Sequence, residues 1–245
     1  MDTRLKRLDP RTALSAIADI VMPRVCVVCG APLIMQEKHI CSGCLVDMPL
    51  THFSRSRHNE MADKFNALIE ADRYCNAAAL YFYGEESGYR NISQALKYHR
   101  NFSAGWYFAE MLGKELSESE IFRDVDLVVP VPLHWTREFK RGYNQSDYIG
   151  RAVAKKLGSE YRKDYLVRTK RTKTQTKVDP DEKSQNVAGA FKAKEWKKKK
   201  RPEHILIVDD VYTTGATLAE CYKAIRKEAG NGVRISIATL AYVGR

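Results

Sequence analysis

The chain has 245 residues, of which 44% are apolar, enough for one sizeable domain with a small appendage or for two small domains. No apolar run approaches the roughly 18 residues of a membrane-spanning helix, which argues against a membrane protein. The net charge of +11 favours polyanionic ligands such as nucleotides, sugar phosphates or nucleic acids.

The N-terminal segment, MDTRLKRLDPRTALSAIADIVMP, has a short apolar patch from Ala13 to Met22 that Asp19 interrupts. It lacks a small-residue cleavage site, so we expect a helix over residues 1–25 and not a signal peptide. The expected location of the protein is therefore the cytoplasm, where free cysteines are usual and disulfides are rare.

Four of the six cysteines form two CxxC pairs, Cys26 with Cys29 and Cys41 with Cys44. A CxxC turn brings two thiolates to one ion, and two such turns complete a tetrahedral site. Because four thiolates leave no open position, the expected metal is structural zinc, with iron–sulfur ligation as the less favoured alternative. We expect a helix and a double-CxxC zinc ribbon or knuckle over residues 1–50, folded largely by metal binding.

The other two cysteines, Cys75 and Cys221, stand among apolar residues. Cys221 shares the apolar face of a predicted helix with Leu218, Tyr222 and Ile225. Both cysteines are interpreted as small buried hydrophobic residues.

After a polar connector over residues 51–76, strand and helix patterns alternate along the chain. The expected strands are 77–84, 124–134, 164–169, 189–196, 204–210 and 233–243. The expected helices are 89–100, 105–118, 144–158 and 217–229. The polar, charged loop over 170–187 is long for a compact domain, as lids and disordered segments are. The alternation predicts a doubly wound α/β domain over 77–245, with a mostly parallel sheet flanked by helices.

The positive charge is concentrated in residues 134–200, which carry twenty Lys and Arg against eight Asp and Glu. Such a region favours a polyanion. The run of four lysines at 197–200 is by itself more simply interpreted as a solvated turn.

The stretch ILIVDDVYTTGAT, residues 205–217, places Asp209 and Asp210 at the end of an apolar strand. Ligands of open parallel sheets gather at this end of the strands. The following loop runs into a helix, whose N-terminus offers unpaired N–H groups and a positive dipole. Small hydroxyl residues and one glycine line this loop, at Thr213, Thr214, Gly215 and Thr217. The stretch predicts a monophosphate site beside carboxylates that accept hydrogen bonds from a sugar.

This stretch resembles the thirteen-residue signature of type I phosphoribosyltransferases, which bind 5-phosphoribosyl 1-pyrophosphate (PRPP). The resemblance implies that Asp209 and Asp210 contact the ribose 2- and 3-hydroxyls and act in catalysis. It also implies that the following loop holds the 5-phosphate, through Tyr212, Thr213, Thr214, Gly215, Ala216 and Thr217.

A second resemblance covers nearly the whole chain. The double CxxC is followed by VVPVPLH (128–134), RxxxRGYNQS (137–146), TKTQT (172–176), NVAGAF (186–191) and the PRPP signature. This order is typical of the ComF family, which includes ComFC and GntX-like proteins and is similar to the transferase half of amidophosphoribosyltransferases. One departure is Lys183, where the family pattern has an arginine that contacts phosphate with two N–H groups.

The resemblance implies a pyrophosphate-binding loop at Val131, Pro132, Leu133 and His134. Arg137 and Arg141 are the nearby cations, or alternatively solvated helix residues, and Lys97 is a weaker candidate. The candidates for contact with the acceptor are Tyr143, Asn144 and Gln145. Asn144 is alternatively a helix N-cap, and Tyr143 alternatively a packing residue.

The loop over 170–187 corresponds to the flexible lid of type I phosphoribosyltransferases, with Lys170, Arg171, Lys173 and Gln175 as candidates to reach the diphosphate. Loss of pyrophosphate from C1 passes through an oxocarbenium-like transition state, which a closing lid protects from water. Lys170 and Arg171 are counted with the catalytic residues.

The predicted function is Mg²⁺-dependent transfer of phosphoribosyl from PRPP to an unknown acceptor, expected to be a nitrogen nucleophile, with release of pyrophosphate. No glutaminase part is expected, so the name amidophosphoribosyltransferase would apply to the transferase half only. The alternative is a non-catalytic accessory factor in competence and DNA uptake that binds single-stranded DNA, with PRPP as a regulatory ligand. A transferase fold retained as a scaffold is a third interpretation.

Overall fold

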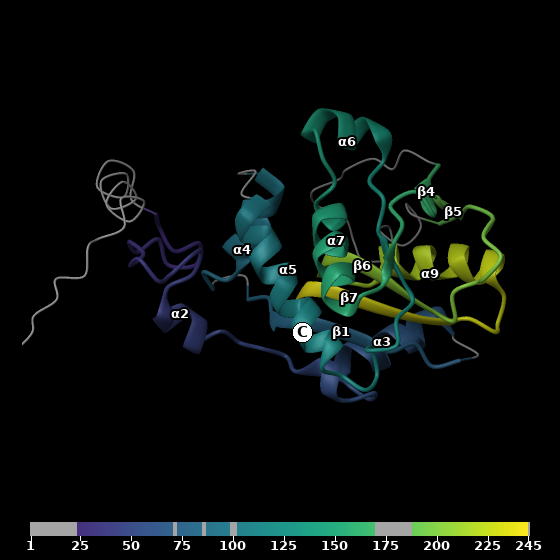
Figure 1. Ribbon diagram of the computed structural model, residues 1–245, viewed down its shortest axis with the longest axis horizontal. Coiled ribbons are helices and arrows are strands. Elements are labelled where there is room, and N and C mark those ends of the chain that lie inside the picture. The colour runs from purple at the N-terminus through teal and green to yellow at the C-terminus, as the bar shows by residue number, and fades with distance from the viewer. Residues whose placement is uncertain (1–23, 71–72, 85–86, 99–101, 170–187, 245) are drawn as a thin grey trace, which may run out of the picture.

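The computed structural model describes residues 24–70, 73–84, 87–98, 102–169 and 188–244, without the side chains at 97, 98, 137 and 140 (Figure 1). The predicted N-terminal helix and the predicted lid over 170–187 therefore lie outside the described residues. Among the described helices, none combines the length and the apolar character that crossing a bilayer requires.

A five-stranded sheet forms the centre of the fold, with the strand order β1-β7-β6-β2-β3 and parallel pairing throughout. Its strands are β1 (Ala77–Phe82), β2 (Leu127–Pro130), β3 (Glu160–Tyr161), β6 (His204–Tyr212) and β7 (Arg234–Tyr242). A separate antiparallel pair consists of β4 (Leu166–Arg168) and β5 (Phe191–Ala193), which lie within the expected strands 164–169 and 189–196. The predicted α/β class, with a mostly parallel sheet flanked by helices, is confirmed.

Helices lie on both faces of this sheet (Figure 1). They are α3 (Glu60–Ile69), α4 (Arg90–Tyr98), α5 (Phe102–Ser117), α7 (Gln145–Leu157) and α9 (Ala216–Ala229). The helix α6 (Trp135–Arg141) lies apart from these at the top of the view in Figure 1. A short α2 (Ser42–Val46) belongs to the cysteine-rich segment, and a 3-10 turn, η1, spans Phe53–Arg55.

Alternate residues of each strand enter two different apolar clusters, as expected for a sheet that is covered on both faces. In β6, Ile205 and Ile207 pack with α3, α9 and the β4–β5 pair, whereas Leu206 and Val208 pack with α4, α5 and α7. All four side chains are fully buried. Burial of each one contributes about 1.5–3 kcal/mol, so this apolar run fixes β6 in the middle of the domain.

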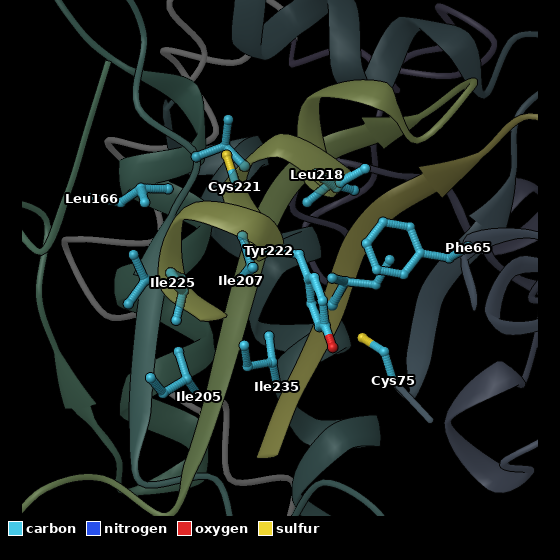
Figure 2. Close-up of a cluster of buried hydrophobic side chains, with 14 of the residues drawn as sticks. Phe65, Cys75, Leu166, Ile205, Ile207, Leu218, Cys221, Tyr222, Ile225 and Ile235 are labelled. Atoms are coloured by element: carbon cyan, nitrogen blue, oxygen red, sulfur yellow. The ribbon is translucent and has the colours of Figure 1, made fainter. Parts of the chain in front are cut away.

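The two cysteines outside the CxxC pairs lie in the first of these clusters, as predicted. Cys75 is 1% exposed and Cys221 is fully buried. Figure 2 shows Cys221 and Tyr222 of α9 in one cluster with Ile207 of β6. Burial raises the pKa of both thiols well above the usual range, which keeps them protonated and supports the interpretation as small apolar residues.

Outside the cysteine-rich segment, two of the described helices were not expected from the sequence. The predicted connector over 51–76 contains α3, whose Met61 and Phe65 are fully buried against the sheet, so this segment is part of the core. Its N-cap is Asn59, whose side chain accepts from the Ala62 N–H at 2.9 Å. The other helix, α6, directly follows the expected pyrophosphate loop at 131–134.

Candidate functional site

The carboxyl end of β6 carries the two adjacent acids. Asp209 is partly buried, and Asp210 is 5% exposed. The Ser146 hydroxyl donates to Asp209 Oδ1 at 2.7 Å, and the Asp210 N–H donates to the same oxygen at 2.9 Å. These two hydrogen bonds fix the orientation of the Asp209 carboxylate, which acts as a hydrogen-bond acceptor.

The position of this strand end in the sheet is the one at which parallel α/β folds bind ligands. After β2 the chain crosses through α7 to β3 on one side, whereas after β6 it crosses through α9 to β7 on the other side. Since β2 and β6 are neighbours, their carboxyl ends lie at a topological switch point. The acids near the end of β6 therefore lie at the edge of the sheet where this topology creates a crevice.

The loop after β6 leads directly into α9. Gly215 has a φ of +78° and is the N-cap residue of α9. A Cβ at this position would lie 2.6 Å from the Tyr212 hydroxyl oxygen, so both the backbone conformation and the space require glycine. The first turn of α9 contains no acidic residue. The loop from Thr213 to Thr217 thus presents a helix N-terminus beside the carboxylates, an arrangement suited to a phosphate group.

Within this loop, the Ala216 N–H points to the Thr214 hydroxyl oxygen at 3.5 Å. Thr213 is exposed and Thr217 is partly exposed. The hydroxyl groups singled out in the sequence therefore belong to one short loop that solvent can reach.

The segment after β2 is joined to the acidic pair through α7. The Val131 N–H donates to the Val208 carbonyl at 2.9 Å, and the Val131 carbonyl accepts from the Asn144 side-chain amide at 2.9 Å. The Asn144 side chain also accepts from the Ser146 N–H at 3.1 Å and caps α7. The N-cap interpretation of Asn144 is confirmed. The predicted pyrophosphate loop and the acids are thus connected by a continuous set of hydrogen bonds.

The remaining predicted contacts lie around the start of α7. Gln145 is buried and accepts from Arg141 Nη1 at 2.6 Å. Tyr143 is 8% exposed, and its hydroxyl donates to the Leu96 carbonyl, as the packing interpretation expects. His134 caps α6 through Thr136. Their roles toward pyrophosphate or acceptor stay predictions.

Several predicted residues cannot be placed. Lys170, Arg171, Lys173, Gln175 and Lys183 lie outside the described residues. Of Arg137 and Lys97 the structure describes only the backbone. The sequence analysis also missed one residue, Ser146, which is 1% exposed and touches Asp209. Its place two positions after the helix-capping Asn144, at the end of the RxxxRGYNQS motif, was the available signal.

The four CxxC cysteines converge on one point. Their sulfur atoms all lie within 4.8 Å of one another, and the Cys29 and Cys41 sulfurs are 3.8 Å apart. A tetrahedron with Zn–S bonds of about 2.3 Å places sulfurs about 3.8 Å apart, so the donor set and its spacing fit zinc. The Cys41 N–H donates to Cys26 Sγ at 3.3 Å. Burial would raise the pKa of the Cys26 thiol, but backbone N–H groups lower it to about 7.

Glu37 holds the two cysteine turns together. Its carboxylate accepts from the Ile34 N–H at 3.0 Å, from the Ser42 N–H at 2.6 Å and from the Ser42 hydroxyl at 2.8 Å. Gly30, with a φ of +75°, closes the first turn. The cluster is therefore shaped by backbone contacts as well as by its cysteines.

Only part of the basic region can be described. The lysines at 197–200 are exposed, and Lys198 pairs with Glu160 at 2.6 Å. The solvated-turn interpretation of this run agrees with that exposure. These lysines follow β5 in the chain.

The chain is similar to proteins that are named for competence and DNA use. It is 26% identical to competence protein F of Haemophilus influenzae over 82% of this chain and 90% of that protein. It is 25% identical to DNA utilization protein YhgH of Salmonella typhimurium over 88% of this chain and 96% of that protein. The YhgH protein of Escherichia coli K12 is 31% identical over 45% of this chain and 47% of its own length. The predicted resemblance to the ComF family is thereby confirmed.

No family model matches the chain. Among solved structures, adenine phosphoribosyltransferase from Leishmania tarentolae aligns with 71% of this chain and 80% of its own, at 14% identity and a TM-score of 0.29. At this score the alignment carries no argument.

Proposed function

We propose that the protein is a Mg²⁺-dependent phosphoribosyltransferase that binds PRPP at the carboxyl end of β6. The observation that carries the proposal is the juxtaposition of Asp209 and Asp210 with the Gly215 loop and the N-terminus of α9, at the switch point of the sheet. Carboxylates accept from vicinal sugar hydroxyls, and helix N–H groups donate to a phosphate. PRPP offers both groups on one ribose.

In this proposal the residues of the chain bind and orient the substrate. Asp209, fixed by Ser146 and by the Asp210 N–H, accepts from one ribose hydroxyl, and Asp210 accepts from the other. The nitrogen lone pair of the acceptor forms the new bond to C1 while the C1–O bond breaks and its electrons leave with pyrophosphate. The acceptor then loses a proton to solvent. Magnesium supplies neutralisation of the negative charge on the pyrophosphate.

The test is a calorimetric titration of PRPP into the protein in the presence and absence of Mg²⁺. We expect saturable binding with magnesium and much weaker binding without it. Without the metal, the pyrophosphate group of PRPP brings its full negative charge to a site that contains two carboxylates. Absence of binding under both conditions contradicts the proposal. Pyrophosphate release with added nitrogen acceptors then separates turnover from binding alone.

A second candidate function is the handling of single-stranded DNA, favoured by the basic balance of residues 134–200 and by the names of the relatives. Binding that depends on phosphate contacts releases counterions. We therefore expect the affinity for a fluorescent oligothymidylate, measured by anisotropy, to fall steeply and log-linearly with salt. An affinity that does not change with salt contradicts this candidate, and it leaves the PRPP proposal untouched.

A further inference from the structure

The helix α6 exposes two large aromatic side chains. The Trp135 side chain is 70% exposed and that of Phe139 is 86% exposed, well above the other exposed aromatic residues among the described ones, Tyr74 at 37% and Phe82 at 36%. Trp135 and Phe139 are four positions apart, so they lie on the same side of the helix, one turn from each other. Figure 1 shows α6 at the top of the molecule, joined to the body by the segments that lead from β2 and into α7.

The conformation of α6 is fixed by contacts that leave this aromatic side open. His134 caps its first turn, and Gly142, with a φ of +83°, ends it. Glu138 lies between the two aromatic positions in sequence and accepts from Lys163 Nζ at 2.6 Å, which ties α6 to the segment after β3. The Trp135 ring contacts that of His134, with 5.7 Å between centroids. The two rings are thus held outward on an anchored helix.

The charge of α6 selects the class of partner. Its sequence, WTREFKR, has three basic residues and one acid, and that acid is already paired with Lys163. A second copy of this chain, which also carries +11, would be repelled by a basic face. A membrane surface would require a longer apolar face than a seven-residue helix with two exposed rings provides. Single-stranded nucleic acid offers both matching groups, phosphates for the cations and bases for the rings.

We propose that Trp135 and Phe139 form a stacking platform for two bases of a single-stranded nucleic acid that runs across α6. This inference rests on the second candidate function, the handling of single-stranded DNA, and adds the place and the mode of contact. Phosphate contacts make the affinity depend on salt, whereas base stacking does not, so the two contributions can be measured separately. Loss of the rings reduces affinity and leaves the dependence on salt unchanged.

The experiment compares the native protein with three variants for binding to a fluorescent oligothymidylate across a range of salt concentrations. Trp135→Ala/Phe139→Ala is expected to bind at least about 30-fold more weakly than the native protein, with the same slope of log affinity against log salt. Trp135→Phe/Phe139→Tyr keeps two aromatic faces and is expected to bind nearly as the native protein does. Leu68→Ala removes a 41% exposed side chain elsewhere and serves as the control.

The outcomes are separable. Equal affinity of the alanine and native proteins overturns the platform and keeps DNA binding, whereas a native protein that does not bind the oligonucleotide overturns both. A reduced slope in the alanine variant means that the rings only position phosphate contacts, and this too overturns the platform. Binding of native protein, but not of the alanine variant, to vesicles of anionic lipid without oligonucleotide binding would assign the face to a membrane. Thermal melting of each variant excludes unfolding, and PRPP titration reports the other site independently.

Discussion

An Asp209→Asn/Asp210→Asn variant is expected to lose Mg²⁺-dependent PRPP binding by a factor on the order of 100 to 10,000. Each hydrogen bond to an ionised carboxylate contributes about 1.5–3 kcal/mol, and the proposed complex loses the charge of two acceptors. Asparagine keeps the size of each side chain, so the strand end is perturbed little. Calorimetry measures the change in affinity directly.

The matched control for this variant is Glu118→Gln/Glu120→Gln, which removes the same charge from two side chains that are 66% and 86% exposed. It is expected to bind PRPP as the native protein does. If the control weakens binding as much as the aspartate variant, the effect is one of overall charge and the assignment of the site is wrong. Melting temperatures are compared as well, because Asp210 is 5% exposed and its replacement could affect folding.

Ser146→Ala tests how the acidic pair is positioned in the same assay. The hydroxyl is 1% exposed, donates to Asp209 Oδ1 at 2.7 Å, and belongs to the chain of contacts that reaches Val131. Because it orients Asp209 without itself contacting the ribose, we expect a smaller loss of affinity, roughly tenfold. Ser146→Thr retains the hydroxyl and should recover part of the lost affinity for PRPP. An unchanged affinity in the alanine variant would show that Asp209 needs no such support.

The sequence predicted the centre of the fold because its local signals and the tertiary environment agree. The apolar run in β6 and the apolar stripe of α9 correspond to burial on both faces of one sheet. The helix α3 was missed although six of the ten residues in EMADKFNALI are apolar and Met61, Phe65 and Ile69 recur every four positions, because the polar stretch before it favoured a connector. The helix α6 was missed because seven residues span only about two turns, too few for a periodic signal.

Of the candidate site, the sequence could predict the parts that lie within one continuous stretch, but not the contacts between distant positions. The acids and the phosphate loop are contiguous in sequence, so one motif contains them. The contact between Ser146 and Asp209 joins positions 63 residues apart, and only the pairing of β2 with β6 brings their elements together. Likewise, the exposure of Trp135 and Phe139 follows from how α6 is anchored, which no local pattern reveals.

Loss of one zinc ligand is expected to have the largest effect on stability. Cys26, Val28 and Ile40 belong to the same apolar cluster as the α4 and α5 side chains of the main domain. The Tyr89 hydroxyl also donates to the Cys44 carbonyl at 2.8 Å, and a Cβ at Gly88 would lie 2.4 Å from the Val28 carbonyl oxygen. The cysteine segment is therefore packed closely on the start of α4, and unfolding it uncovers part of the core.

Cys29→Ser is the appropriate variant because Cys29 is the exposed member of the cluster, so its replacement changes packing least. We expect loss of bound zinc, measured by elemental analysis, and a destabilisation of roughly 4 kcal/mol or more, as is typical when a structural metal is lost. For a domain of this size that corresponds to a fall in melting temperature on the order of 10 °C. Treatment of the native protein with a strong chelator should produce the same shift.

Cys75→Ala provides the control, since Cys75 is buried outside the cluster. It should keep one zinc ion per chain even if the small cavity lowers the melting temperature. Thiol labelling adds a second readout. After removal of the metal by the chelator, Cys29, Cys41 and Cys44 should react with the reagent, whereas Cys75 and Cys221 stay unreactive in the folded domain. If the purified protein contains iron and sulfide instead of zinc, the four cysteines hold an iron–sulfur cluster. Full stability of Cys29→Ser without any metal would mean that the apolar contacts with α4 suffice to fold the segment.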